Sequence, residues 1–436
     1  MSAPAFALRG IYFHDGFLVD PPRHAPLTWD LAQWTAQLRW LRACGLNAVE
    51  FATMLEFNRR PSTPLEHRKI ADRLRLLDLA HAMDMQFGYL LSNTVLSTVP
   101  AGEEPGDQLG DRAQVLCPRQ PGNFERTLEI PLFYQETYRE ADFFEEFAAD
   151  WGGCTCGQCG VPEFRRYVEA LSANLEALNP QARLYANTWC ISYWGKDPLA
   201  EGWKGVFERE ISGTRELIAA LPSLPANTHL ALPCHHLYRA LAFSEYGSRA
   251  QPPVFPTTAD LQPVLQAGRQ VLAWPHFVMD DDAYRPLAWG VVHTEVRYLR
   301  ALIQTLAATG ISQVVGNLYL PLLQLPNTFA FARLCQDPGL DPTGILAEFA
   351  RLLAHPADRA LLAEVLAWVE NHSYWQQQLP ADARLPLLPC SLSDPQVEAA
   401  AAAIRPNPAS DLPLPCPAGL WLEDLRRSLP RLAQIP

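Results

Sequence analysis

Short apolar runs alternate along the chain with stretches in which apolar residues recur every three or four positions. The short runs are typical of buried strands, and the longer period is typical of helices that cover one face of a sheet. Strands are expected over residues 9–13, 47–53, 86–91, 142–149, 183–190, 228–233, 270–277 and 312–320. A helical stretch follows each of them within about 330 residues, so the pattern predicts a (β/α)8 TIM barrel.

An open, doubly wound sheet is the second architecture that this alternation could form. Its nucleotide-binding version needs a G-x-G-x-x-G turn after the first strand, and neither that turn nor a P-loop occurs in the sequence. Helix caps are also visible. Thr28 is the expected N-cap of the first helix, which Gly45 ends, and Thr257 or Thr258 begins the helix after the sixth strand.

Two segments depart from the alternation. Residues 92–123 are polar, rich in glycine and proline, and too long for an ordinary connection, which indicates a functional loop. From residue 341 the pattern is helical only, over residues 345–353 and 359–368, and a proline-rich tail with an alanine run follows. The predicted organisation is a catalytic barrel over residues 1–338 and a C-terminal helical region with a Pro-rich tail over residues 339–436.

Composition narrows the classes of partner. With 35 Lys and Arg against 47 Asp and Glu, the net charge is −12, which argues against nucleic acid or an anionic membrane as a partner. No apolar run of about 18 residues occurs, so no membrane span is expected. The first residues show neither a basic segment nor an apolar one, so no signal peptide is expected. A cytoplasmic location follows, in which the ten cysteines would be reduced thiols or metal ligands.

The carboxyl ends of the expected strands carry carboxylates, amides, histidines and indoles, and barrel enzymes place their chemistry at that end. A carboxylic acid and a carboxylate are the groups that glycoside hydrolysis needs, and indole rings stack on sugar faces. The candidate substrate-binding residues are His14, Asp15, Asn93, Trp151, Asn187, Trp189, Trp194, His235, His236, Trp274, Asn317 and Tyr319.

Four aspartates are the candidate catalytic residues. Asp150 ends the fourth expected strand, and Asp280, Asp281 and Asp282 follow the seventh. The alternatives are that Asp150 caps a turn or pairs with arginine, and that the three adjacent aspartates form a solvated turn. Weaker candidates are Glu50, Glu145 and Glu146, of which one or two are expected to lie buried in the barrel as hydrogen-bond partners.

Cys154, Cys156 and Cys159 are close enough in sequence to ligate a structural zinc ion with a fourth ligand from elsewhere. The candidates for that ligand are Cys190, Cys234, His235 and His236. A second CxxC pair, which a zinc ribbon would have, is absent, so a tight loop of buried thiols is the alternative. No cofactor is expected to be required.

The segment 149–159, with Asp150, a Gly-Gly pair and the three cysteines, resembles an Asp-x-Gly-Gly-Cys-x-Cys-x-x-Cys segment of bacterial barrel proteins. These belong to the α-glucuronidase-like and β-hexosaminidase-like glycoside hydrolase superfamily. Residues 316–333 are similar to the eighth strand and following helix of those proteins, and residues 345–350 fit their C-terminal part. The resemblance covers about residues 7–370 in architecture and these short segments in detail.

The resemblance implies a glycoside hydrolase barrel. Its hexosaminidase-like branch implies an Asp–Glu pair after the fourth strand, but here Trp151 follows Asp150, so Asp150 alone carries over as a site acid. The sequence therefore predicts a glycoside hydrolase that acts on a small glycoside or oligosaccharide through paired carboxylates. The alternatives are a metal-dependent hydrolase that uses the Cys and His cluster, and a non-catalytic carbohydrate-binding barrel.

Overall fold

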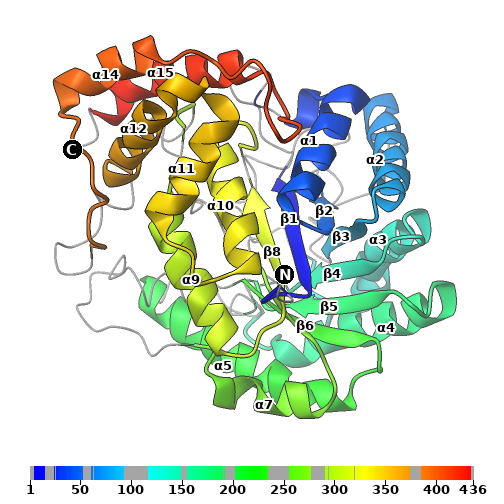
Figure 1. The fold of residues 1–436 in the computed structure, drawn as a ribbon. Coiled ribbons are helices and arrows are strands. Elements are labelled where there is room, and N and C mark those ends of the chain that lie inside the picture. Colours follow the sequence, from blue (N-terminus) through cyan, green and yellow to red (C-terminus); the bar gives the residue numbers. More distant parts are fainter. Residues whose placement is uncertain are drawn as a thin grey trace.

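Eight parallel strands close into a barrel, and helices surround it, in the computed structural model of the chain (Figure 1). The strands are β1 (Leu8–His14), β2 (Ala48–Ala52), β3 (Gln86–Ser92), β4 (Phe143–Phe147), β5 (Arg183–Asn187), β6 (Thr228–Leu232), β7 (Val271–Ala273) and β8 (Gln313–Leu318). β8 pairs with β1, with Gln313 opposite Leu8, and this pairing closes the barrel. The predicted (β/α)8 TIM barrel is therefore confirmed.

The structure describes residues 4–14, 24, 26–52, 60–61, 63–92, 116–148, 154, 156–189, 191, 202–233, 255–275, 290–292, 294–318, 320–373 and 384–433. Within these ranges, no helix combines the length and the apolar character that crossing a bilayer requires.

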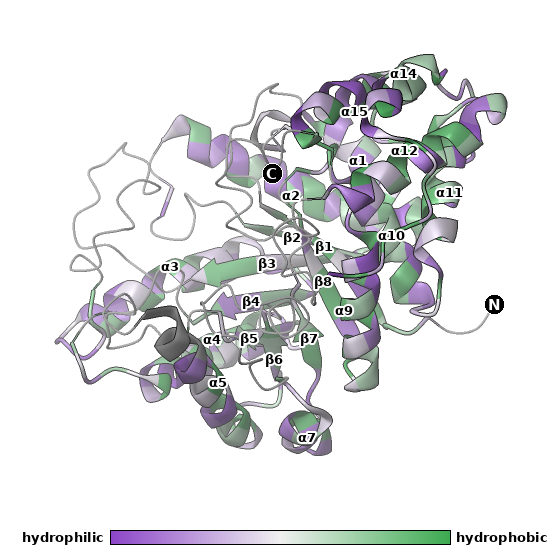
Figure 2. Cartoon of the chain, turned by 90° about the vertical axis from the view of Figure 1, so that its left-hand side faces the viewer, coloured by the Kyte–Doolittle hydropathy of each residue, from purple (hydrophilic) through white to green (hydrophobic). Residues whose placement is uncertain are grey.

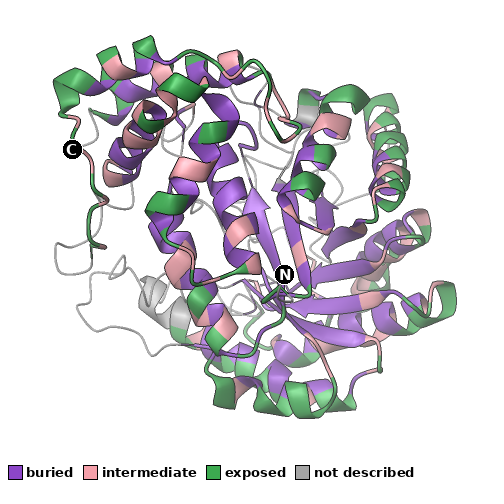
Figure 3. Ribbon diagram, in the orientation of Figure 1, coloured by how far each residue is buried: buried purple, intermediate pink, exposed green. Residues whose placement is uncertain are grey.

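The helices of the barrel layer are α1 (Leu31–Cys44), α2 (Pro64–Ala82), α3 (Asn123–Thr137), α4 (Val161–Leu178), α5 (Gly202–Ala220), α7 (Thr258–Gln266), α9 (Val296–Ala308) and α10 (Leu325–Gln336). Most of them mix hydrophobic and hydrophilic residues along their length (Figure 2), as helices with one face on a sheet do. Their outer faces are exposed, whereas the strands are buried almost throughout (Figure 3).

Four further helices follow the barrel: α11 (Pro342–Leu353), α12 (Arg359–Asn371), α14 (Asp394–Ala403) and α15 (Ala418–Leu432). The expected Pro-rich tail thus contains two helices. α15 is amphipathic, and it contacts the chain both after β1 and after β8. Trp421 Nε1 donates to the carbonyl of Leu322, 3.0 Å away, and Asp424 Oδ2 lies 3.2 Å from Nε2 of His24.

The caps explain where two helices begin. The first helix begins at Asp30, whose Oδ1 accepts from the backbone N–H of Gln33 at 2.8 Å, while Gln33 Oε1 accepts from the N–H of Asp30. The prediction of Thr28 as this cap is wrong, because Thr28 ends a separate 3₁₀ turn. Gly45, with a φ of 96°, ends α1 as expected, and Thr257 is the N-cap of α7.

Side chains on each strand alternate between the barrel interior and the layer beneath the helices. On β4, Phe143 and Phe147 belong to the interior cluster and Phe144 to the outer core. The same alternation places Glu145 inside the barrel and Glu146 on the outer side. The two adjacent glutamates therefore have different surroundings, although both are fully buried.

Polar side chains fill the amino end of the barrel. Gln270 Oε1 accepts from Tyr185 OH at 3.0 Å and from Gln313 Nε2 at 2.7 Å, and Arg183 Nη1 lies 3.3 Å from the same oxygen. Burial beside Arg183 lowers the pKa of His229 to about 4, so this ring is neutral. The amino end of the barrel is thus filled by side chains that are hydrogen-bonded to one another.

Candidate active site

A pair of buried glutamates lies inside the barrel. Glu50 is the third residue of β2 and Glu145 the third of β4, and neither is exposed to solvent. The two carboxyl groups lie within hydrogen-bonding reach of each other, which requires that one of them carry a proton. Glu50 Oε1 and Glu145 Oε2 receive no N–H or O–H from the other described side chains, so a proton shared between the carboxyls is what satisfies them.

The outer oxygens of the pair are held by two residues that the sequence predicted for the site. Trp274 Nε1 donates to Glu50 Oε2 at 3.2 Å, and Asn187 Nδ2 donates to Glu145 Oε1. Asn187 Oδ1 in turn accepts from the backbone N–H of Trp189 at 2.8 Å. One amide thereby fixes both the carboxyl of Glu145 and the chain that leaves β5.

Burial decides the protonation of this pair. Desolvation raises the pKa of Glu50 to about 8, and desolvation followed by the charge of Glu50 raises the pKa of Glu145 well above its ordinary value. At neutral pH the pair therefore holds at least one proton. A carboxylic acid that stays protonated at pH 7 is the state that a hydrogen-bond or proton donor requires.

Aromatic rings surround the pair. The Trp274 ring centroid lies 5.0 Å from that of Tyr12 and 5.2 Å from that of Phe147. The ring of Trp189 lies 6.0 Å from Trp274 and 6.4 Å from Phe147. Trp189 is partly exposed, whereas Trp274 is 2% exposed. Trp189 is thus the described indole that can meet a ligand, and Trp274 serves to hold Glu50.

Other predicted site residues are located only in part. Asn317 is fully buried on β8 and lies opposite Tyr12 of β1. His14 is the last residue of β1, and only its backbone is described. The predicted residues outside the described ranges are Asp15, Asn93, Asp150, Trp151, Trp194, His235, His236, Asp280, Asp281, Asp282 and Tyr319.

The Glu50–Glu145 geometry does not match a glycosidase acid–nucleophile pair. The two carboxyls of such a pair stand about 5–5.5 Å apart in retaining enzymes and about 6.5–9.5 Å apart in inverting ones. Hydrogen-bonded carboxyls are closer than either spacing. Both carboxyls are also fully buried, whereas an acid–nucleophile pair must reach its substrate. The sequence alone could have shown which of the two adjacent glutamates points into the barrel, because alternate residues of a strand face opposite sides of the sheet.

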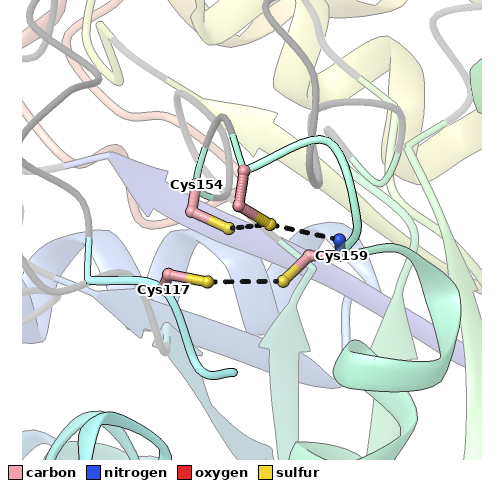
Figure 4. Close-up of side chains that lie close together, drawn as sticks. Cys117, Cys154 and Cys159 are labelled. Carbon is pink, nitrogen blue, oxygen red and sulfur yellow. Dashed lines mark hydrogen bonds between the residues drawn. The ribbon is translucent and has the colours of Figure 1, made fainter. Parts of the chain in front are cut away.

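The three predicted metal-binding cysteines converge, and a fourth joins them. The sulfurs of Cys117, Cys154, Cys156 and Cys159 all lie within 4.8 Å of one another (Figure 4). Cys117 occupies the place for which Cys190, Cys234, His235 and His236 were considered, and those four lie outside the described residues. Cys117 precedes α3, and Cys154, Cys156 and Cys159 precede α4. Both segments are strand-to-helix connections, and they meet at the same end of the barrel, as expected.

We expect the glutamate pair to make stability depend on pH. A pKa that folding raises means that the folded chain binds the proton more tightly, so this stabilisation is complete below about pH 4.5 and is lost as pH rises to about 8. Glu50→Gln keeps an acceptor for Trp274 and cannot ionise. Between pH 5 and pH 8 it should therefore lose about 2–4 kcal/mol less stability than wild type.

Urea unfolding at the two pH values measures this difference. Glu348→Gln is the matched control, because Glu348 is partly exposed on α11 and its variant should parallel wild type at both pH values. Equal losses of stability by the Glu50→Gln variant and wild type between pH 5 and pH 8 would contradict the shared proton.

No protein-family model matches the chain, and no curated protein matches its sequence. Its fold is similar to that of CpGH84B, with 13% sequence identity and a TM-score of 0.52 over 100% of this chain and 63% of that one. It is also similar to a GH138 enzyme targeting pectin rhamnogalacturonan II, with 10% identity and a TM-score of 0.53 over 85% of this chain and 44% of that one.

A mutant of the Thermobaculum terrenum O-GlcNAc hydrolase gives a TM-score of 0.49 and 13% identity over 83% of this chain and 66% of that one. The chain thus spans less than two thirds of the length of each of these proteins. At such identities the two similarities with TM-scores above 0.5 show a shared barrel fold.

Proposed function

We propose that the protein is a glycoside hydrolase that acts on a small glycoside or oligosaccharide. The observation that carries this proposal is the arrangement at the end of β5. There the partly exposed Trp189 follows Asn187, which donates to the carboxyl of Glu145, a group whose pKa burial raises. An apolar ring beside hydrogen-bonding groups at the carboxyl end of a barrel suits a sugar, which has an apolar face and a hydroxyl rim.

The proposed catalytic groups are Asp150 and one of Asp280, Asp281 and Asp282. Asp150 follows β4 in the chain and the other three follow β7, so the two groups belong to strands three positions apart around the barrel. One carboxyl would protonate the glycosidic oxygen, and the other would attack the sugar or activate water. Glu50 and Glu145 would support the floor beneath the substrate without taking part in bond cleavage.

The similarity of the fold to other barrels supports a glycoside hydrolase more weakly than the residues of the site do. A barrel of the same fold is found in the GH138 enzyme that targets pectin rhamnogalacturonan II. Because barrels host many chemistries, this similarity supports carbohydrate chemistry only by analogy. Among the described residues, the single cluster that could hold a metal is the group of four cysteines. Four thiolates would leave no position for water on the ion, so this cluster suits a structural metal better than the metal-dependent hydrolase.

A panel of chromogenic α- and β-glycosides, followed by short oligosaccharides, tests the proposal. We expect turnover of at least one of them by wild type. Binding of a sugar in calorimetry without turnover would replace the proposal by a carbohydrate-binding barrel. If wild type neither turns over nor binds any sugar of the panel, the proposal is overturned.

Trp189→Ala should raise KM about 3- to 10-fold with a smaller change in kcat, because the indole provides a stacking surface and no reacting atom. Steady-state kinetics on the best substrate measures this change. Trp189→Phe is the matched variant, since it keeps a flat ring, and it should recover most of the affinity. If the alanine variant loses melting temperature and keeps its KM, Trp189 serves only to pack against Phe147 and Trp274.

A further inference from the structure

We propose that Cys117, Cys154, Cys156 and Cys159 bind one structural zinc ion, which fastens the connection before α3 to the connection before α4. Cys117 lies in the turn that precedes α3, and the other three lie between β4 and α4. The proposal concerns metal binding alone and stands independently of the proposed glycosidase activity.

The distances between the sulfurs fit a tetrahedral site. Cys117 Sγ lies 3.7 Å from Cys159 Sγ, and Cys154 Sγ lies 3.4 Å from Cys156 Sγ (Figure 4). Four sulfurs at about 2.3 Å from a central zinc ion are separated from one another by about 3.8 Å. All the separations are within 4.8 Å, so the four thiols already lie close to the arrangement that one zinc ion requires.

The turn from Cys156 to Cys159 has the form of a metal-binding loop. Cys156 Sγ accepts from the backbone N–H groups of Gln158 at 3.4 Å and Cys159 at 3.3 Å. Gly157 adopts a φ of 73°, which permits the tight turn. Backbone donors aimed at one sulfur stabilise its thiolate, which is the form that binds metal. The same turn directs the Cys159 sulfur to the same point.

Bonds outside the thiols hold the two segments together. Arg119, two residues after Cys117, donates from Nη1 to Glu163 Oε1 at 2.9 Å, and Glu163 Oε2 accepts from the N–H of Gly160, the residue after Cys159. Asn123 Nδ2 donates to the carbonyl of Cys117 at 3.1 Å. A metal site needs such outer bonds to orient its ligands, and here they converge on both ligand segments.

Four thiolates leave no position for water, so the ion would be structural and not catalytic. Its effect would be on the connections that leave β3 and β4. Residues 149–153, which include Asp150, run between the last described residue after β4, Ala148, and Cys154. Through Cys154, zinc would fix the C-terminal end of residues 149–153. Through Cys117, it would fix the chain shortly before α3.

Metal analysis of the purified full-length chain, kept under reducing conditions, tests the proposal. We expect one zinc per chain in wild type. Cys117→Ser should lose most of this zinc, and Cys390→Ser, which changes a half-buried thiol of the C-terminal region, should keep it. Zinc at the wild-type level in the Cys117→Ser variant would overturn the four-cysteine site. So would a wild-type chain that holds no zinc and takes up none when zinc is supplied, or one that holds iron.

A second measurement on wild type keeps the test decisive if Cys117→Ser does not fold. Chelation should lower the melting temperature, and zinc but not magnesium should restore it. Cobalt added to the chelated chain should give the intense thiolate-to-metal absorption and the d–d bands of a tetrahedral four-sulfur site. Absence of these bands would overturn the proposal. All these signals are read without substrate, so they are independent of whether the chain hydrolyses glycosides.

Discussion

Asp150→Asn should lower kcat about 100- to 10,000-fold on the best glycoside while the fold is kept, because a general acid contributes a factor of that size. Asparagine has the shape of aspartate and cannot transfer the proton. The same loss is expected for one, and only one, of Asp280→Asn, Asp281→Asn and Asp282→Asn. Steady-state kinetics and melting temperature, measured on the same preparation of each variant, test both expectations.

Asp84→Asn is the matched control for these variants. Asp84 is exposed just before β3, at the amino end of the barrel, and its φ of 52° is one that asparagine adopts readily. This variant should keep wild-type kcat. A lower melting temperature for Asp150→Asn with unchanged turnover per folded molecule would contradict the catalytic role and indicate a turn-stabilising one.

Glu370→Ala should lower the free energy of unfolding by about 3–5 kcal/mol, because it leaves the buried guanidinium of Arg297 without its partner charge. Glu370 Oε1 lies 3.1 Å from Arg297 Nε, and both side chains are almost completely buried. The carboxylate also accepts the backbone N–H groups of Val296 and Arg297 at the start of α9. Denaturant unfolding followed by tryptophan fluorescence measures the loss.

The pair Arg333–Glu348 provides the control, since its N···O distance is also 3.1 Å but its side chains are 32% and 41% exposed. Glu348→Ala should cost no more than about 1 kcal/mol, because water screens an exposed pair. Similar costs for the two alanine variants would contradict the view that burial, and not the presence of an ion pair, fixes the stability of the junction between α9 and α12.

The barrel was predictable because each strand is a short apolar run and most of the helices are amphipathic. The helix α15 was missed because the prolines around it hid the spacing of Trp421, Leu425 and Leu429, which are buried. Its cap-free start, after Pro417, gave no further signal. The first helix was predicted to begin too early, because Thr28 and Asp30 are both suitable caps and only the bond to Gln33 distinguishes them.

The candidate site was predictable to a smaller extent. Asn187, Trp189 and Trp274 were identified from their places at strand ends, and they meet around Glu50 and Glu145. The hydrogen bond between the two glutamates depends on the stagger of β2 against β4, which a single sequence does not specify. Cys117 was missed because 36 residues separate it from Cys154. Only the adjacency of β3 and β4 brings it close.

The pairing of β1 with β8 means that the barrel can close only late in synthesis. β1 leaves the ribosome before its second partner, β8, which is made only after the six intervening strands, roughly 15–60 seconds later at usual elongation rates. During that interval the nascent sheet has two open edges, which are prone to pair with other chains. The contacts of α15 with Leu322 and His24 arrive later still. Chaperones that meet this chain during translation would thus encounter an unclosed sheet, whose first edge stays open until the last strand emerges.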